Sequence, residues 1–521
     1  MKKYSYVSLF SSAGVGCFGF KLEGFDCVAT NELIERRLQV QKNNKTCFKS
    51  TGYLGGDVKL QETKDKILNE VNLYKENNED IDFLTATPPC QGISLANHKK
   101  TKSDKHRNSL VLESILLTKA ILPRVFIFEN VRNFMKTICT DEDGEDKRID
   151  ETIFAHLSDE YIICSYLLNF KNFGVSSSRT RALVIGVRKD IVNIHPLKLL
   201  PFRSDVSTLR DTIGHLNSLS EMGEFDEDDF LHNYKSFDLK MLPWVELLKE
   251  GESAFDNTDP NRIPHSIKDD VVVPNANKNG DKYKRQLWEN VAPCVHTRND
   301  TFSSQNTIHP KDNRVFSIRE LMLMMSVPDS FQWFKEPYSE LNKLESEKKK
   351  RLLKTNEINI RQSLGEAVPT NIFKQIASNY KRVLNNEYSS NLSVKELDEM
   401  YELFKYFIPD GPKTKSIRIK VQSKNQEFIA MLIEHLNILN YYQVKLKISG
   451  FEHKNLDFTL PAHINVIENI ERFDFMIYDN LSQLDIEPNN SIKKHILISK
   501  NAEAISPTLT IKDSLSMDKV N

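Results

Sequence analysis

The chain has 521 residues, 39% of them hydrophobic, so it is long enough for two or three domains with sizeable cores. A formal net charge of -1 excludes nucleic-acid binding through a strong overall field, and such a partner would require local basic patches. The seven cysteines form no CxxC pair and no Cys/His cluster at metal-ligand spacing, which argues against a metal site and favours a reducing compartment. Without a signal-like N-terminus or a membrane-length apolar run, we expect a cytoplasmic protein with no membrane contact.

Short apolar runs alternate with helical stretches in the first part of the chain. This pattern predicts an α/β fold with a doubly wound parallel sheet. The expected helices are Glu35–Asn43 and Ser109–Leu122, the latter with a wide apolar face. The expected strands are Tyr6–Phe10, Cys27–Thr30, Asp82–Thr85, Val125–Glu129, Ile162–Leu168 and Ala182–Val187.

The alternation ends near residue 190, which we take as the end of the first domain. Residues 191–284 are acidic and contain Pro and Asn, which predicts a loop-rich second lobe. Regularity returns over 285–386, where Ser339–Glu357 is typical of a charged, solvated helix. A separate C-terminal α/β domain is expected over 387–521, with strands in the runs SIRIKVQ, YYQVKLKISG, FDFMIYD and KKHILISK.

The segment VSLFSSAGVGCFGF places Phe10 at a strand end, followed by Gly14 and Gly16 in a turn before a helix. Small residues let a backbone approach a nucleoside cofactor, and Glu32, after the next strand, could accept hydrogen bonds from ribose hydroxyls. Asp57 follows a third strand end and could accept a hydrogen bond from an adenine amino group. The dinucleotide GxGxxG pattern is not matched, so a purely structural turn is an equally good reading.

Three further elements carry side chains suited to chemistry. In TPPCQGIS, two prolines end a strand and present Cys90 at the sheet edge where ligands bind in doubly wound folds. A lone cysteine is more often an inert core residue. Glu129 ends the run VFIFEN, and Arg179 and Arg181 stand two apart at the start of a strand, which predicts guanidinium groups on one side.

In this order the segments resemble the DNA cytosine-5 methyltransferase family of bacterial restriction-modification systems. The resemblance covers roughly residues 4–380 and includes Pro88–Gln91, the Glu-Asn-Val element at Glu129 and the Arg-x-Arg pair. It extends to Arg314 and Glu320 in a later helical segment and to the closing run RQSLGEAVPTNIFKQIA. Among its departures, the family's Asn after Gly365 is Glu366.

The resemblance implies a Rossmann-like methyltransferase domain that uses S-adenosylmethionine to methylate carbon 5 of cytosine in duplex DNA. It implies that Cys90 is a covalent nucleophile on a flipped base, and that the other catalytic residues are Glu129, Arg179 and Arg181. The residues expected to bind the cofactor are Phe10, Gly14, Gly16, Glu32, Asp57, Val58, Ala367 and Val368.

The basic stretch after the nucleophile is placed to bind DNA phosphates, and a solvated loop is its alternative interpretation. The expected DNA contacts are Gln91, Lys99, Lys100, Lys102 and Arg107. By the same resemblance, residues 1–190 and 285–386 form the catalytic domain and residues 191–284 form a target-recognition region. We expect a monomer and leave open a partner restriction endonuclease, tRNA as substrate, and an inactive DNA-binding homologue. The target sequence and the role of residues 387–521 cannot be inferred.

Overall fold

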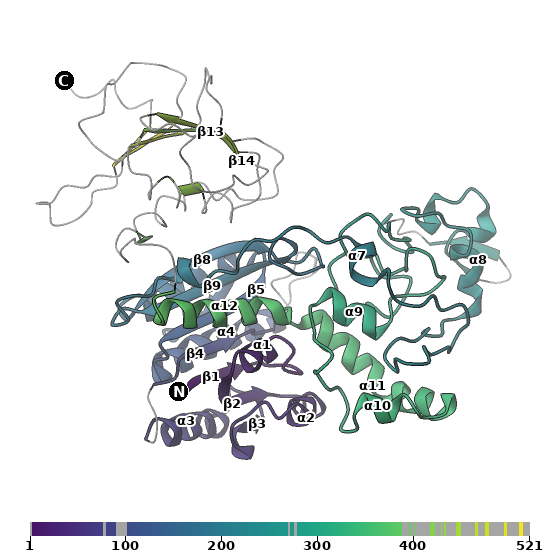
Figure 1. Cartoon of the computed structure of the whole chain (residues 1–521), viewed down its shortest axis with the longest axis horizontal. Coiled ribbons are helices and arrows are strands. Elements are labelled where there is room, and N and C mark those ends of the chain that lie inside the picture. Colours follow the sequence, from purple (N-terminus) through teal and green to yellow (C-terminus); the bar gives the residue numbers. More distant parts are fainter. Residues whose placement is uncertain are drawn as a thin grey trace, which may run out of the picture. The chain divides into compact units, whose positions relative to one another are not determined.

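The computed structural model describes residues 3–76, 80–89, 102–268, 271–275 and 279–387, together with short segments of the tail beyond them. The chain divides into two compact units, which are described separately (Figure 1). The first unit contains Met1–Ile191 and Leu199–Lys381, and the second contains Val192–Lys198 and Arg382–Asn521. Among the described residues, no helix is both long and apolar enough to cross a membrane.

A seven-stranded sheet forms the centre of the first unit, in the order β3-β2-β1-β4-β5-β9-β8. Strands β1 to β5 are parallel, whereas β9 is antiparallel to both of its neighbours, so the predicted doubly wound sheet is mainly parallel with an antiparallel edge. The cause is the short connection from β8 to β9, which is a hairpin rather than a crossover. The strands are β1 (Tyr4–Leu9), β2 (Phe25–Glu32), β3 (Tyr53–Gly55), β4 (Phe83–Ala86), β5 (Val125–Val131), β8 (Tyr161–Asn169) and β9 (Thr180–Arg188).

Both faces of this sheet are buried, as expected for a mainly parallel sheet. On one face, apolar residues of α3 (Gln61–Lys75), α4 (Lys102–Ile121) and α5 (Ile149–Leu157) share a core with Val7 and Leu9 of β1. On the other face, aromatic rings of α1 (Phe18–Leu22) and α12 (Thr370–Leu384) pack on the strands, with Phe20 stacked on Tyr6. Helix α2 (Glu35–Asn43) has the predicted bounds, whereas α4 begins seven residues before the predicted Ser109. A small hairpin pairs β6 (Ile138–Thr140) with β7 (Asp146–Arg148).

Short elements and loops make up residues 191–284, as the composition predicts. The elements are α6 (Pro196–Leu199), α7 (Leu209–Ile213), α8 (Leu242–Val245) and the hairpin of β10 (His265–Lys268) with β11 (Val271–Pro274). A small core around Trp244 and Tyr283 also uses Phe302, Ile308 and Val315, which lie beyond Lys284. The packing of this region therefore continues past the boundary at which its sequence pattern changes.

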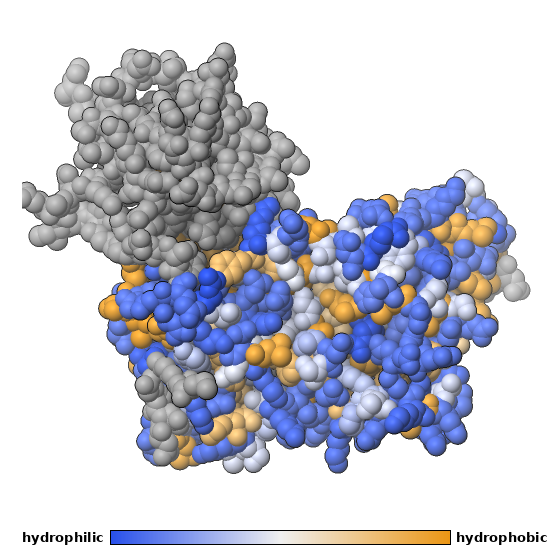
Figure 2. All heavy atoms as spheres, in the orientation of Figure 1, coloured by the Kyte–Doolittle hydropathy of each residue, from blue (hydrophilic) through white to orange (hydrophobic). Residues whose placement is uncertain are grey.

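The returning segment contains α9 (Ile318–Met324), α10 (Tyr338–Leu341) and α11 (Ser346–Glu366). The solvated helix expected over Ser339–Glu357 is thus two helices, and α11 buries Leu353, Ile360 and Leu364. Burial of this apolar stripe explains why α11 extends well beyond its charged first half. The face of this unit shown in Figure 2 is mostly hydrophilic, with scattered hydrophobic residues.

The second unit contains a six-stranded sheet in the order β14-β13-β12-β15-β16-β17. Its strands are β12 (Ile417–Gln422), β13 (Val444–Ser449), β14 (Ile464–Val466), β15 (Phe475–Tyr478), β16 (Lys494–Leu497) and β17 (Thr510–Asp513). The four predicted tail strands are confirmed as β12, β13, β15 and β16. All pairings are parallel except β16 with β17.

Candidate active site

The loop after β1 has an unusual backbone. Phe10, Ser12 and Gly14 have φ angles of 56°, 49° and 79°. Positive φ is costly for a bulky residue such as Phe10, and strain of this kind concentrates at functional sites. A Cβ atom on Gly14 would lie 2.9 Å from Cγ of Gln41, so this position requires glycine for space as well as for conformation.

Buried polar side chains hold this loop in place. Glu32 accepts hydrogen bonds from the backbone N–H of Ser12 at 2.8 Å and of Ile34 at 2.9 Å. Gln41 donates to Ser11 Oγ at 2.8 Å and to the Ser12 carbonyl at 2.7 Å. Burial raises the pKa of Glu32, although hydrogen bonds from Ile34 and Ser12 and the charge of Arg37 oppose this. A carboxylate has about four acceptor positions, so Glu32 retains capacity for ligand hydroxyls.

The closing segment packs directly on the same loop. A Cβ atom on Gly16 would lie 3.1 Å from Val368 Cβ, and Thr370 Oγ1 donates to the Val15 carbonyl at 2.8 Å. Ala367 and Val368 are buried. The structure therefore brings Gly16 and the predicted closing residues together, although they are about 350 positions apart in the sequence.

Asp57 lies two residues after β3, at the same edge of the sheet as Glu32. Its carboxylate accepts a hydrogen bond from Lys59 N–H at 3.0 Å, which shapes the turn. Asn31 Nδ2 donates to the Gly56 carbonyl at 3.1 Å and ties this turn to β2. Val58 is buried in the core of the unit, so its side chain supports the turn from below.

The Pro-Pro-Cys element is anchored on both sides. Thr87 Oγ1 donates to the Phe10 carbonyl at 3.0 Å, and Asn130 Nδ2 donates to the Pro88 carbonyl at 2.9 Å. These bonds join the segment after β4 to the ends of β1 and β5. Cys90 and Gln91 lie outside the described residues, and the anchored chain leads directly to them.

Glu129 and Arg181 form an ion pair at the same sheet edge. Glu129 Oε1 lies 3.2 Å from Arg181 Nε, and the two side chains are 5% and 16% exposed. The antiparallel register pairs Glu129 with Leu183 and Val131 with Arg181, so Glu129 and Arg181 are diagonal neighbours on one face. Burial raises the pKa of Glu129, and the charges of Arg181 and Arg179 oppose this increase. Glu129 Oε1 accepts no hydrogen bond from the described residues.

Arg179 is fully buried and binds backbone carbonyls. It donates to the carbonyl oxygens of Val295, Gly365 and Glu366 at 2.9, 3.1 and 3.2 Å. These contacts fasten the end of α11 to the start of β9. Its charge still lowers the pKa of Glu129, so Arg179 positions the site and also contributes to its electrostatics.

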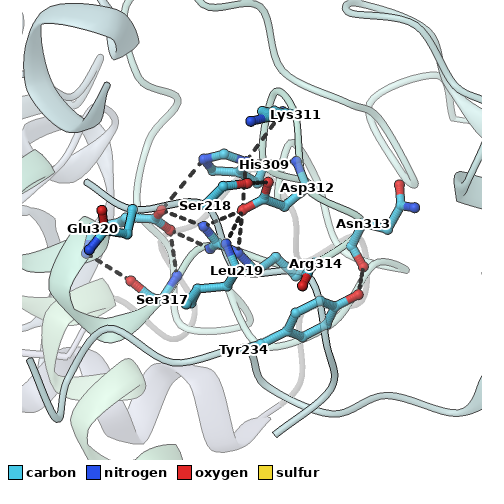
Figure 3. A network of polar contacts seen from close by, with 12 residues as sticks. Ser218, Leu219, Tyr234, His309, Lys311, Asp312, Asn313, Arg314, Ser317 and Glu320 are labelled. Carbon is cyan, nitrogen blue, oxygen red and sulfur yellow. Dashed lines mark hydrogen bonds and ion pairs between the residues drawn. The ribbon is translucent and has the colours of Figure 1, made fainter. Parts of the chain in front are cut away.

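A buried polar network surrounds Arg314 and Glu320 (Figure 3). Both terminal nitrogens of Arg314 donate to Glu320 at 2.8 Å, and its Nε donates to Asp312 at 3.0 Å. Ser317 caps α9 through a reciprocal pair of hydrogen bonds with Glu320. His309 lies 3.5 Å from Glu320, and burial lowers its pKa to about 4. Arg314 and Glu320 therefore orient α9, and no hydrogen bond or ion pair among the described residues joins them to Glu129 or Arg181.

Most of the predicted DNA-contacting residues lie outside the part of the chain that the structure describes. Lys99 and Lys100 lie outside the described residues, as does Gln91. Lys102 and Arg107 lie in α4, so the backbone of this part of the basic stretch is helical and does not form a loop.

Several positioning residues have no clear sequence signal. Gln41 is one polar residue among many in a predicted helix, and Thr87 precedes the prolines without a motif of its own. Glu366, where the sequence departs from the family, pairs with Arg37 at 2.7 Å. Only the fold reveals this partner, because the two residues are far apart in the chain.

The fold and the site together define the class of protein, which is an α/β enzyme. Its site combines a strained loop, carboxylates and a buried Glu/Arg pair at the carboxyl edge of a mainly parallel sheet. A family model described as C-5 cytosine-specific DNA methylase matches residues 4–382. The chain therefore belongs to the C-5 cytosine-specific DNA methylase family, and it is a DNA cytosine-5 methyltransferase.

The similar known proteins include bacterial modification enzymes. Type II methyltransferase M1.HgaI of Avibacterium volantium is 27% identical over 390 residues, covering 71% of this chain and 96% of that protein. Type II methyltransferase M1.HphI of Haemophilus parahaemolyticus is 26% identical, covering 74% and 88%. A crystal structure of a prophage-encoded DNA modification methyltransferase from E. coli shares the fold, with a TM-score of 0.50 and 18% identity over 74% of this chain and 100% of that one.

Proposed function

We propose that this chain methylates carbon 5 of a flipped cytosine through a covalent Cys90 adduct, with S-adenosylmethionine as methyl donor. The observation that carries the proposal is the bond from Asn130 to the Pro88 carbonyl. It joins the segment that leads to Cys90 with the strand that bears Glu129, beside Arg181. The nucleophile's segment and the proton-holding carboxyl group are thus connected through adjacent residues.

The residues at the sheet edge fit the proposed cofactor. Gly14 and Gly16 let the loop pack against Gln41 and Val368, which a side chain at either position would displace. Glu32 and Asp57 supply acceptors for ribose hydroxyls and an adenine amino group, and Phe10, Val58, Ala367 and Val368 supply apolar surroundings. When bound, S-adenosylmethionine supplies an electrophilic methyl group.

The chain's own residues would activate the cytosine. The Cys90 thiolate adds its electron pair to carbon 6, which makes carbon 5 nucleophilic. Glu129 holds a proton at ring nitrogen 3, where negative charge develops, and Arg181 binds the ring carbonyl oxygen. After methylation, loss of the carbon 5 proton expels the Cys90 thiolate and restores the ring. The base must leave the helix first, at a cost of a few kcal/mol.

The substrate proposed is duplex DNA with a specific target sequence, which residues 191–284 would recognise. Lys99, Lys100, Lys102 and Arg107, with Gln91, would contact DNA close to the flipped base. We further propose that the chain acts in the cytoplasm as a monomer beside a cognate restriction endonuclease, since its relatives are named Type II methyltransferases.

The test compares Cys90→Ala with the wild type on DNA containing 5-fluorocytosine, which traps the covalent adduct. We expect the variant to form no adduct and no methylated product, while binding S-adenosylmethionine and duplex DNA normally by calorimetry, because the thiol acts only in bond formation. Cys47→Ala, at a free and half-buried cysteine outside the Pro-Pro-Cys element, should behave as wild type. Turnover by Cys90→Ala would contradict the mechanism, and labelling of tRNA in a parallel assay would contradict the substrate.

A further inference from the structure

The sheet of the second unit lies wholly beyond the matched residues 4–382, so the family match does not account for it. Its pairing register divides the strand positions into two faces, because alternate positions of a strand belong to opposite faces of a sheet. Strands β13 and β14 of this sheet are labelled in Figure 1. The two faces differ sharply in composition.

One face, which we call the apolar face, contains mostly branched aliphatic residues. Its only charged positions in the described strands are Lys494 and Asp513, which are register partners of opposite sign. Its other positions are Ile417, Ile419, Val421, Val444, Leu446, Ile448, Ile464, Val466, Phe475, Ile477, Ile496 and Ile511.

The opposite face, which we call the basic face, contains Arg418, Lys420, Lys445, Lys447 and Lys512 and no acidic residue within the described strands. Arg418 is the register partner of Lys445, and Lys420 is the register partner of Lys447. Basic residues therefore occupy paired register positions on two neighbouring strands.

Like charges at paired positions of neighbouring strands repel each other. Positions two apart in a strand are about 7 Å apart and neighbouring strands about 4.8 Å, both less than the screening length of about 8 Å at physiological salt. Directly opposed like charges destabilise a sheet, and strands covered by helices on both faces usually have apolar residues on both. A bound polyanion would offset the repulsion.

We propose that the basic face binds the phosphate backbone of duplex DNA without regard to sequence. The inference rests on the chain acting on DNA, and the whole-chain net charge of -1 means that phosphate binding requires local basic clusters. Because the basic face belongs to the same chain as the catalytic unit, each contact it makes raises the local concentration of DNA at the active site.

The experiment uses the full-length enzyme and a quadruple variant, Arg418→Gln, Lys420→Gln, Lys445→Gln and Lys447→Gln. Affinity for a duplex without a target site is measured from low to high salt. We expect binding about tenfold weaker or more at low salt, and a log-log salt slope reduced by about 3 to 4, since each lost phosphate contact removes about 0.9. The charge-preserving variant Arg418→Lys, Lys420→Arg, Lys445→Arg and Lys447→Arg should retain the wild-type slope.

Two further measurements separate the proposal from its alternatives. Methylation at saturating DNA should be unchanged in the quadruple variant, whereas failure of the proposed reaction would abolish it in the wild type as well. Acetylation of Lys420, Lys445 and Lys447 in the wild-type enzyme should slow when duplex DNA is added. An unchanged salt slope, or lysines that react equally with and without DNA, would overturn the proposal, as would a basic face already covered by acidic segments of the chain and therefore unreactive throughout.

Discussion

Two opposing effects act on the pKa of the buried Glu129 carboxyl group. Removal from water favours its protonated form, and the neighbouring Arg181 and Arg179 favour its charged form. Burial is the larger effect, so the pKa lies above its ordinary value. A carboxyl group with a raised pKa can retain a proton and share it with a cytosine ring that gains electron density during the reaction.

Replacing Glu129 by Gln preserves shape but cannot supply the same proton. We expect the methylation rate at saturating substrate to fall roughly 10²-fold, as when an oxyanion donor is removed. Because the protonated form acts, the wild-type rate should decline as pH rises through the raised pKa, and this limb should be absent in the variant. Single-turnover rates across pH check both points. Glu62→Gln, on the exposed face of α3, is the matched control, and a normal Glu129→Gln rate would remove Glu129 from the mechanism.

At the scale of elements, the loop after β1 depends on a close approach between α1 and α12. A Cβ atom on Gly19 would lie 2.5 Å from both the Thr370 carbonyl oxygen and Lys374 N–H nitrogen. Backbone on both sides leaves no flexible side chain to move away. The same contact holds Thr370 against Val15, so the loop and its closing helix are packed as one body.

Gly19→Ala should therefore lower the free energy of unfolding by about 1 to 3 kcal/mol, the usual cost of overpacking. It should also weaken S-adenosylmethionine binding, because the adjacent loop must shift. Denaturant unfolding and calorimetry measure the two effects. Gly280→Ala, where an added Cβ meets nothing within 4 Å, should change neither. Equal stability of both variants would show that α1 and α12 are less closely packed.

The network around Arg314 places a titratable group at the start of α9. His309 is neutral in the folded protein, with a pKa lowered to about 4 by burial, and its Nδ1 accepts from Asp312 N–H at 2.9 Å. In the unfolded chain the same imidazole binds a proton below about 6.5. Between these values the unfolded state holds more protons, so stability falls as pH falls.

His309→Asn keeps an acceptor near Nδ1 without the titration. Between pH 7 and pH 4, the wild type should lose up to roughly 3 kcal/mol more stability than this variant. Urea unfolding at several pH values measures the difference. The exposed His215→Asn should follow the wild type. Parallel pH curves for His309→Asn and wild type would show that His309 is not held neutral.

At the scale of the whole molecule, we propose that catalysis and target choice use different parts of the chain. The residues at the carboxyl edge of the sheet can act on a cytosine whatever its neighbouring sequence. Residues 191–284, in contrast, form short elements joined by hydrogen-bonding loops. Base edges in the major groove offer a distinct donor and acceptor pattern for each pair, which such loops can read.

Grafting residues 191–284 from a related enzyme should move methylation to the donor's target. Because Phe302, Ile308 and Val315 complete the small core of this region, a second graft ending after Val315 should be more stable and equally redirected. Sequencing of methylated DNA from cells that make each chimera identifies the sites. An active chimera that kept the original target would place recognition elsewhere.

The sequence alone predicted the parts of this protein that depend on local order. Strand positions, the bounds of α2, the family motifs and the tail strands follow from periodicity and short motifs, which neighbouring residues determine. The positions of Cys90, Glu129 and Arg181 in those motifs were sufficient to predict the chemistry and the family.

Tertiary structure decided which distant residues meet. Four features join segments far apart in the chain. They are the antiparallel pairing of β9, the ion pair of Glu366 with Arg37, the hydrogen bonds of Arg179 to the carbonyls of Val295 and Gly365, and the small core shared with residues beyond Lys284. Such contacts depend on how the chain returns through space and leave no pattern within a short window of sequence. The same reason hid the basic face, since only strand register shows which alternating residues become neighbours.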